Sequence, residues 1–256
     1  MNRMQLAATS APGNISESAF DLTHENTSNC SPEFHHSLFV PLHYEKGYAY
    51  PLLVWLHGDG DNERQLKRVM PGISLRNHVA VAPRGTSASD VVDNAFCWRQ
   101  SEADVIEAQW RLTSCIETVQ NRYNIHAGRV FLGGYADGGT MALRLALRMP
   151  RICAGVVSVG GALPTSHAPL VNIERARGLS VMLMQGEAST DYSSTQLCGD
   201  LRLLHAAGIS VAVRQYPAED ELTTKMLSDI DSWMMERVTG EQSQPQKAVC
   251  NRLERN

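Results

Sequence analysis

Apolar residues recur along the middle of the chain in short unbroken runs, and amphipathic stretches separate these runs. The run Leu52–Leu56 has no polar alternation, which is typical of a strand buried on both faces of a parallel sheet. Runs of this kind predict seven strands: Ser37–Leu42, Pro51–Leu56, Val79–Ala82, Val130–Gly133, Gly155–Val159, Val181–Gln185 and Val211–Tyr216.

The stretches between the strands carry apolar residues at helical spacing. Between Asp104 and Arg122, for example, Val105, Ala108 and Leu112 fall on one face of a helix. Four helices are predicted in this way: Asp104–Arg122, Thr140–Arg148, Ser193–Ala207 and Leu222–Val238. Alternating strands and helices predict the α/β class, as a three-layer α/β/α sandwich with a mostly parallel sheet.

The two ends of the chain differ from its middle. Residues 1–30 are rich in Ser, Asn, Thr and Ala and lack periodicity, and residues 240–256 are polar and charged. We expect mobile tails there. Residues 31–239 show no internal repeat and no linker, so they predict a single domain.

Composition and charge limit the binding partners and the cellular compartment that we expect. The 256 residues carry a formal net charge of −4 and a pI of about 6.1, which argues against general nucleic-acid binding. Met1–Ser18 has no apolar core long enough for a signal peptide, and no stretch approaches the length of a membrane span. The six cysteines show no CxxC pairing, so we expect reduced thiols and a cytoplasmic protein. We also expect no cofactor.

The strongest local motif is the segment Arg129–Ala142, which predicts a strand, a glycine-flanked tight turn and a helix. Its centre reads Gly134-Tyr135-Ala136-Asp137-Gly138. The spacing is that of a nucleophile elbow, whose flanking positions must be small because side chains there would collide with the neighbouring strand and helix. The position of the nucleophile is occupied by Ala136.

A second motif, Leu56-His57-Gly58-Asp59-Gly60-Asp61, directly follows a predicted buried strand. A glycine-containing loop in this position lets the backbone approach a substrate and donate an N–H to an oxyanion. We expect the backbone amides of Asp59 and Asp137 to be the two donors of an oxyanion hole.

These motifs resemble the phospholipase/carboxylesterase family of α/β hydrolases, close to dienelactone hydrolases and acyl-protein thioesterases. Residues 37–238 carry the resemblance, through both motifs above and four further segments: Trp98-Arg99, Arg122–Ile125, Gly155–Gly161 and Val181–Gly186. It implies an α/β-hydrolase fold and carboxylic-ester hydrolysis by a serine, a histidine and an aspartate.

The resemblance also locates the three catalytic positions, and none keeps its residue. The serine position is Ala136, the aspartate position is Ser189, and the histidine position is Asp220. A shifted loop would bring Asp191 to the acid position or Glu221 to the histidine position. Alanine has no lone pair for attack, and a carboxylate with a reference pKa of about 4 is a poor base toward a serine hydroxyl.

We therefore expect a catalytically inactive pseudo-hydrolase that binds an unidentified small molecule or protein through the former active-site cleft. An active ester hydrolase with a non-standard constellation stays open as the alternative. Asp137 is a weak candidate nucleophile because it lies one residue late, and Ser158 is better explained as a small residue ending a buried strand.

Several side chains are expected near the cleft. His57, Trp98, Tyr135, Asp191 and Glu221 are the candidates for its lining, with His57 more often a backbone brace than a base in such a loop. The loops at this edge also carry many carboxylates: Asp59, Asp61, Asp137, Glu187, Asp191, Asp220 and Glu221. An acidic cleft suits a cationic ligand or a hard metal ion, but most such carboxylates point to solvent or cap helices, so we predict no metal site.

Overall fold

The structure is a computed structural model that describes residues 35–88 and 94–240. These residues belong to the second of two compact units into which the chain divides, residues 33–256. The predicted tails lie outside the described residues, apart from Gly240, which ends the last helix in a left-handed conformation with a φ of 75°. No described helix is both long and apolar enough to cross a membrane.

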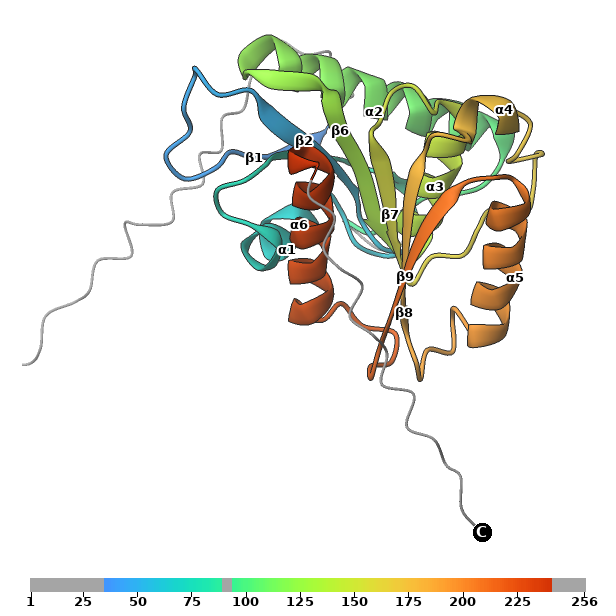
Figure 1. The fold of residues 1–256 in the computed structure, drawn as a ribbon. Helices are drawn as coiled ribbons and strands as arrows, with labels where there is room; N and C mark the ends of the chain where they lie inside the picture. The colour runs from blue at the N-terminus through green and yellow to red at the C-terminus, as the bar shows by residue number, and fades with distance from the viewer. Residues whose placement is uncertain (1–34, 89–93, 241–256) are drawn as a thin grey trace, which may run out of the picture. The chain divides into compact units, whose positions relative to one another are not determined.

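The core of the described unit is a seven-stranded sheet with the order β1-β3-β2-β6-β7-β8-β9 (Figure 1). Strand β1 is antiparallel to β3, and all other neighbours are parallel. The strands are β1 His36–Phe39, β2 Tyr50–Leu56, β3 Val79–Pro83, β6 Ile125–Tyr135, β7 Gly155–Val159, β8 Ser180–Gly186 and β9 Ser210–Tyr216. The predicted α/β-hydrolase architecture and all seven strands are confirmed.

Helices cover both faces of this sheet. They are α1 Gln65–Ile73, α2 Glu102–Arg122, α3 Asp137–Arg148, α4 Ile173–Ala176, α5 Ser194–Ala206 and α6 Thr224–Thr239. Helices α1 and α6 pack with one face of the sheet in one apolar cluster, and α2, α3 and α5 pack with the opposite face in another. The central strands are buried on both sides, as the seven buried residues of β2 illustrate.

The structure adds elements that the pattern did not predict. Strand β6 begins at Ile125, five residues before the predicted start, and a short pair joins β4 Thr86–Ser87 to β5 Phe96–Cys97. Helix α1 contains Pro71 and Gly72, whose low helix propensity obscures the amphipathic pattern. Helix α4 is too short to produce a periodic signal.

The helices begin where the sequence supplies capping side chains. The Ser101 side chain accepts a hydrogen bond from the Asp104 amide at the start of α2, and Thr223 caps α6 in the same way. Ser193 and Gln196 form a reciprocal capping box at the start of α5. Because the parallel strands all run in one direction, the loops after β2, β6, β8 and β9 emerge at one edge of the sheet, where the candidate site lies.

Candidate active site

The elbow between β6 and α3 is a tight turn centred on Ala136. Ala136 has a φ of 49° and a ψ of −121°, a backbone conformation that residues other than glycine rarely adopt. Its amide donates a hydrogen bond of 2.8 Å to the Val159 carbonyl, and its carbonyl accepts one of 3.0 Å from Thr140. The strained turn of a nucleophile elbow is therefore retained although its central side chain is a methyl group.

The glycines on either side of the elbow are required by close backbone contacts. A Cβ on Gly134 would lie 2.4 Å from the backbone of Gly138, and a Cβ on Gly138 would lie 2.2 Å from the His57 carbonyl oxygen. No side-chain movement relieves a clash with backbone atoms. Both glycines thus have a steric reason to persist whether or not the elbow carries a nucleophile.

Ser189 and Asp220, which occupy the positions expected for the acid and the histidine, contact each other directly. The Ser189 hydroxyl donates a hydrogen bond to the Asp220 carboxylate. The Thr190 amide and the Thr190 hydroxyl each donate to the same carboxylate at 2.9 Å. These hydrogen bonds, the one from Ser189 first, lower the pKa of Asp220, so it is ionised at neutral pH and engaged with its own neighbours.

The two loops that carry these residues pack closely. A Cβ on Gly186, at the end of β8, would lie 2.3 Å from the Glu219 carbonyl oxygen. The amides of Glu187 and Ala188 also donate to the carbonyls of Tyr216 and Ala218. The loop after β8, which carries Ser189, and the loop after β9, which carries Asp220, are therefore linked by backbone contacts as well as by the Ser189–Asp220 pair.

A pocket of about 300 Å³, counting the space that opens to solvent, lies over the elbow. Its lining combines apolar groups with four carboxylates. The lining residues are Tyr135, Ala136, Val159, Gly160, Gly186, Ser189, Asp191, Glu219, Asp220, Glu221 and Met226. The three positions that the resemblance assigns to the catalytic residues, Ala136, Ser189 and Asp220, thus line one pocket.

Tyr135 spans this pocket from the elbow to the loop after β9. Its hydroxyl donates a hydrogen bond of 2.7 Å to the Asp220 backbone carbonyl. Its ring lies so close to the loop after β2 that a Cβ on Gly58 would be 2.8 Å from a ring carbon. Burial, followed by the charges of Asp220 and Asp191, raises the pKa of the Tyr135 hydroxyl, which therefore stays protonated and available as a donor.

The expected oxyanion-hole residues occupy the loop after β2 and the start of α3. Asp137 is the first residue of α3, and an amide in the first turn of a helix has no carbonyl one turn earlier to bond. Partial desolvation, with the charges of Asp59 and Asp191, raises the pKa of the exposed Asp137 carboxyl. An anion bound at the Asp137 amide would meet the negative charges of these carboxylates, which disfavours it.

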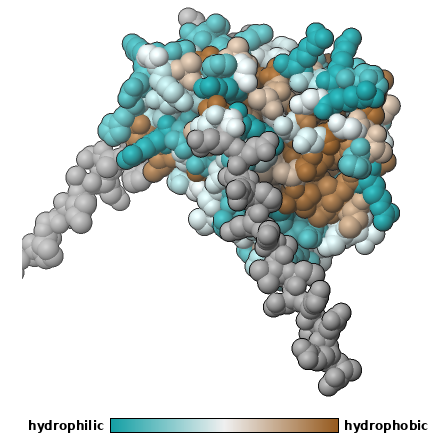
Figure 2. Space-filling view, in the orientation of Figure 1, coloured by the Kyte–Doolittle hydropathy of each residue, from teal (hydrophilic) through white to brown (hydrophobic). Residues whose placement is uncertain are grey.

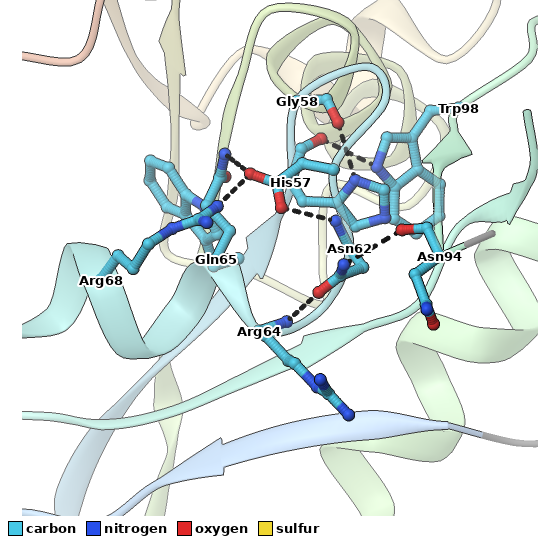
Figure 3. A network of polar contacts seen from close by, with 10 residues as sticks. His57, Gly58, Asn62, Arg64, Gln65, Arg68, Asn94 and Trp98 are labelled. Carbon is cyan, nitrogen blue, oxygen red and sulfur yellow. Dashed lines mark hydrogen bonds and ion pairs between the residues drawn. The ribbon is translucent and has the colours of Figure 1, made fainter. Parts of the chain in front are cut away.

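His57 and Trp98 are buried and support the loop after β2 (Figure 3). His57 Nδ1 donates to the Gly58 carbonyl at 2.8 Å, because its Nε2 accepts a hydrogen bond of 3.0 Å from the Gly85 amide. Trp98 Nε1 donates to the His57 carbonyl at 3.0 Å. Contrary to the prediction, neither side chain lines the cleft, because both are at most 3% exposed.

Burial lowers the pKa of His57, because desolvation disfavours the charged imidazolium. The imidazole is therefore neutral at physiological pH, with both nitrogens occupied by backbone groups. It has no free nitrogen to act as a general base, which leaves the pocket without a histidine from this loop.

The expected group of carboxylates is only partly brought together. Asp191, Asp220 and Glu221 line the pocket, and so does Glu219, which the sequence analysis missed although it belongs to the Tyr216–Leu222 segment. Asp61 instead pairs with Arg68 and accepts a hydrogen bond of 2.9 Å from Gln65. Among the described residues, no three His, Cys, Asp or Glu side chains are arranged to hold a metal ion.

Ser158 lies inside the sheet and not in the pocket. It is 1% exposed, and its hydroxyl donates a hydrogen bond of 2.7 Å to the Gly161 carbonyl. A Cβ on Gly139 would lie 2.5 Å from this hydroxyl, which shows how closely α3 packs there. Ser158 therefore fixes the end of β7 and is not placed to attack a substrate.

The fold and the elbow define an α/β hydrolase, and comparison with known proteins gives the family. The sequence profile of the phospholipase/carboxylesterase family matches residues 45–233. The chain belongs to the phospholipase/carboxylesterase family, as its motifs indicated.

Individual relatives are distant. Lysophospholipase-like protein 1 of Mus musculus is 25% identical over 139 residues, which are 53% of this chain and 58% of that protein. Carboxylesterase SOBER1 of Arabidopsis thaliana is 23% identical over 215 residues, 76% of this chain and 94% of that protein. The match to the putative esterase NocK of Nocardia uniformis subsp. tsuyamanensis spans 40% of that protein. The chain therefore covers about half the length of NocK and of lysophospholipase-like protein 1.

A solved structure supports the fold. The carboxylesterase of Bacillus cereus superposes with a TM-score of 0.62 at 19% identity, covering 80% of this chain and 95% of that one. At this identity the likeness concerns the fold alone.

Substitutions at the elbow test the steric account. We expect Ala136→Gly to raise the free energy of unfolding by about 1 kcal/mol, because glycine relieves the strain of a positive φ. We expect Gly138→Ala to lower it by about 3 kcal/mol or more, because the added Cβ meets backbone atoms. Urea unfolding followed by circular dichroism measures both.

Gly178→Ala is the matched control, since nothing lies within 4 Å of a Cβ at that glycine. A loss of stability in Ala136→Gly, or a Gly138→Ala variant as stable as Gly178→Ala, would contradict the account.

The neutral, buried His57 predicts a loss of stability in acid. Its folded pKa is lowered, so below about pH 6.5 the unfolded chain binds a proton that the folded chain does not. The free energy of unfolding should therefore fall as the pH falls below 6.5, by at most about 1.4 kcal/mol per pH unit from this residue.

Urea unfolding at pH 7.5 and 5.5 should show a smaller pH-dependent loss in His57→Gln than in the unmodified protein. The exposed His205→Gln variant is the control and should retain the full loss. Equal losses in all three proteins would exclude His57 as the source.

Proposed function

We propose that this chain is a pseudo-hydrolase, a family member that no longer hydrolyses esters and binds a small molecule or protein partner through the former active-site cleft. The observation that carries the proposal is the replacement of the whole catalytic constellation inside an intact pocket. Ala136 occupies the elbow, and Ser189 donates to Asp220 where an acid would orient a histidine.

The chemistry of the pocket supports this proposal. Acyl transfer by the family mechanism needs a nucleophile, a base near neutral pKa and donors for the oxyanion. Among the described residues that line the pocket there is no histidine, lysine or cysteine. The carboxylates there favour cations over the negative charge that develops on an ester oxygen during attack.

An ester hydrolase with a different constellation is the second candidate, and the Ser189–Asp220 hydrogen bond is the observation that favours it. In that arrangement Ser189 would attack and Asp220 would take its proton. The lowered pKa of Asp220 counts against it, because a weaker base removes a hydroxyl proton less readily. Asp137 is a poorer choice, since it follows the nucleophile position and is not among the pocket-lining residues.

Other aspects of the function stay predictions. The cytoplasmic location, the absence of a cofactor and the lack of nucleic-acid binding rest on composition alone. The relatives are named as carboxylesterase and lysophospholipase-like proteins, so carboxylic esters are the substrates with which to challenge the proposal.

An esterase assay on the unmodified protein is the first test. We expect no turnover of short p-nitrophenyl esters or thioesters above a heat-inactivated sample, because the pocket holds no competent nucleophile. Ser189→Ala and Asp220→Asn are assayed in parallel to identify the source of any signal. Activity that survives in independent preparations and disappears in either variant would overturn the proposal in favour of the second candidate.

Restoring the family residues tests whether the scaffold still supports catalysis. The triple variant Ala136→Ser, Ser189→Asp and Asp220→His should gain measurable ester hydrolysis, because Ser189 and Asp220 are already in hydrogen-bond contact. Ala136→Ser alone should remain inactive, since it lacks a base. A well-folded triple variant without any activity would show that the pocket has diverged beyond these three positions.

A further inference from the structure

Strand β9 forms one edge of the sheet, and within the described part of the chain it pairs with β8 alone. Its register with β8 is unbroken over Ser210–Tyr216. The other edge is the four-residue β1, which Pro41 follows closely. Natural edge strands are usually kept short or protected by proline, lysine or a bulge, because a free edge is a template for another strand. Strand β9 is longer, with seven residues and no proline, lysine or bulge within them; Arg214 is its one charged residue, and Pro217 follows its end directly.

The outer side of β9 exposes apolar side chains. Val213, at the centre of the strand, is 38% exposed, and Leu203 of the adjacent helix α5 is 51% exposed. Val211 and Ala212 are half-buried. Figure 2 shows brown side chains gathered where Figure 1 draws β9 between α5 and α6. We call Leu203, Val211 and Val213, which lie on the α5 side of the sheet, the β9 edge patch; Ala212 points to the α6 side.

The hydrogen bonds of β9 leave its outer edge open. Among the described residues, its backbone pairs with β8, and at its end the Tyr216 carbonyl accepts from Glu187 and Ala218 at 2.8 Å. The side chain of Gln215 turns to Gln185 of β8, and Arg214 lies 3.9 Å from Asp229 of α6. No described segment covers the edge opposite β8.

We propose that β9 pairs with β9 of a second copy of this chain, antiparallel and around a two-fold axis at Val213, to form a homodimer with one continuous sheet. The occupant is a second copy because the strand is complementary to itself. In this register the seven residues of β9 are all paired, with Val213 opposite Val213 and Ala212 opposite Arg214. An isologous interface requires such self-pairing.

Charge favours the same register. Arg214 is the single charged residue of β9, and it faces the partner's Ala212 and not a second arginine. Like charges directly opposite each other would destabilise the pair, whereas facing valines stabilise it. The patch also brings Leu203 beside the junction, so that apolar contact adds to the backbone hydrogen bonds. This inference does not depend on the proposed function, because the elbow pocket takes no part in it.

Sedimentation velocity and light scattering on the full chain test the dimer. We expect a concentration-dependent dimer, and we expect Val213→Lys to raise its dissociation constant by about tenfold or more, because two lysines would meet at the axis. Val171→Lys is the control: Val171 is 74% exposed but lies outside the patch, so this variant should dimerise normally. Circular dichroism verifies that both variants fold.

Cross-linking tests the register separately. Val213→Cys, in a background carrying Cys30→Ser, Cys198→Ser and Cys250→Ser, should form an intermolecular disulfide on mild oxidation, since facing residues of antiparallel strands have Cα atoms about 4.5–5.5 Å apart. Val171→Cys in the same background should not. A protein that stays monomeric at all attainable concentrations, or a dimer that resists Val213→Lys and fails to cross-link at residue 213, would overturn the proposal.

Discussion

The turn at Ala136 brings three backbone segments into contact, and the rest of the site is arranged around them. The end of β6, the start of α3 and the loop after β2 approach so closely that glycine alone fits at positions 134 and 138. A side chain at either glycine would push α3 away from the sheet. The elbow is therefore a condition of the fold, and it can survive the loss of the reaction for which the family uses it.

The loops after β8 and β9 are also held together by close contacts. In the family pattern, an acid on one loop orients a histidine on the other. Here Ser189 donates a hydrogen bond to Asp220, so the two loops stay linked. The donor now lies on the loop after β8, whereas in the family pattern it is the histidine on the loop after β9. Tyr135 adds a second tie to the Asp220 backbone. A pocket with stable walls and no nucleophile at the elbow is what a binding function requires of this fold.

Much of the fold could be predicted from the sequence, because strands buried on both faces leave unbroken apolar runs. The elbow and the loop at His57 were also located correctly, since tight turns with steric limits constrain the residues that fill them. Helix α1 was missed because Pro71 and Gly72 disrupt its pattern. The side-chain directions were harder to predict, because they depend on loop geometry. Asp61 pairs with Arg68, Trp98 is buried, and Glu219 lines the pocket.

The most direct test of the account is the reaction of the folded protein with a serine-directed fluorophosphonate, followed by intact-mass spectrometry. Such reagents need only a nucleophilic hydroxyl and a functional site around it, so they report catalytic competence without knowledge of the substrate. The account predicts that the unmodified protein stays unlabelled while the variant with serine at 136, aspartate at 189 and histidine at 220 gains one adduct. Stoichiometric labelling of the unmodified protein, mapped to Ser189 or another residue of the pocket, would contradict it.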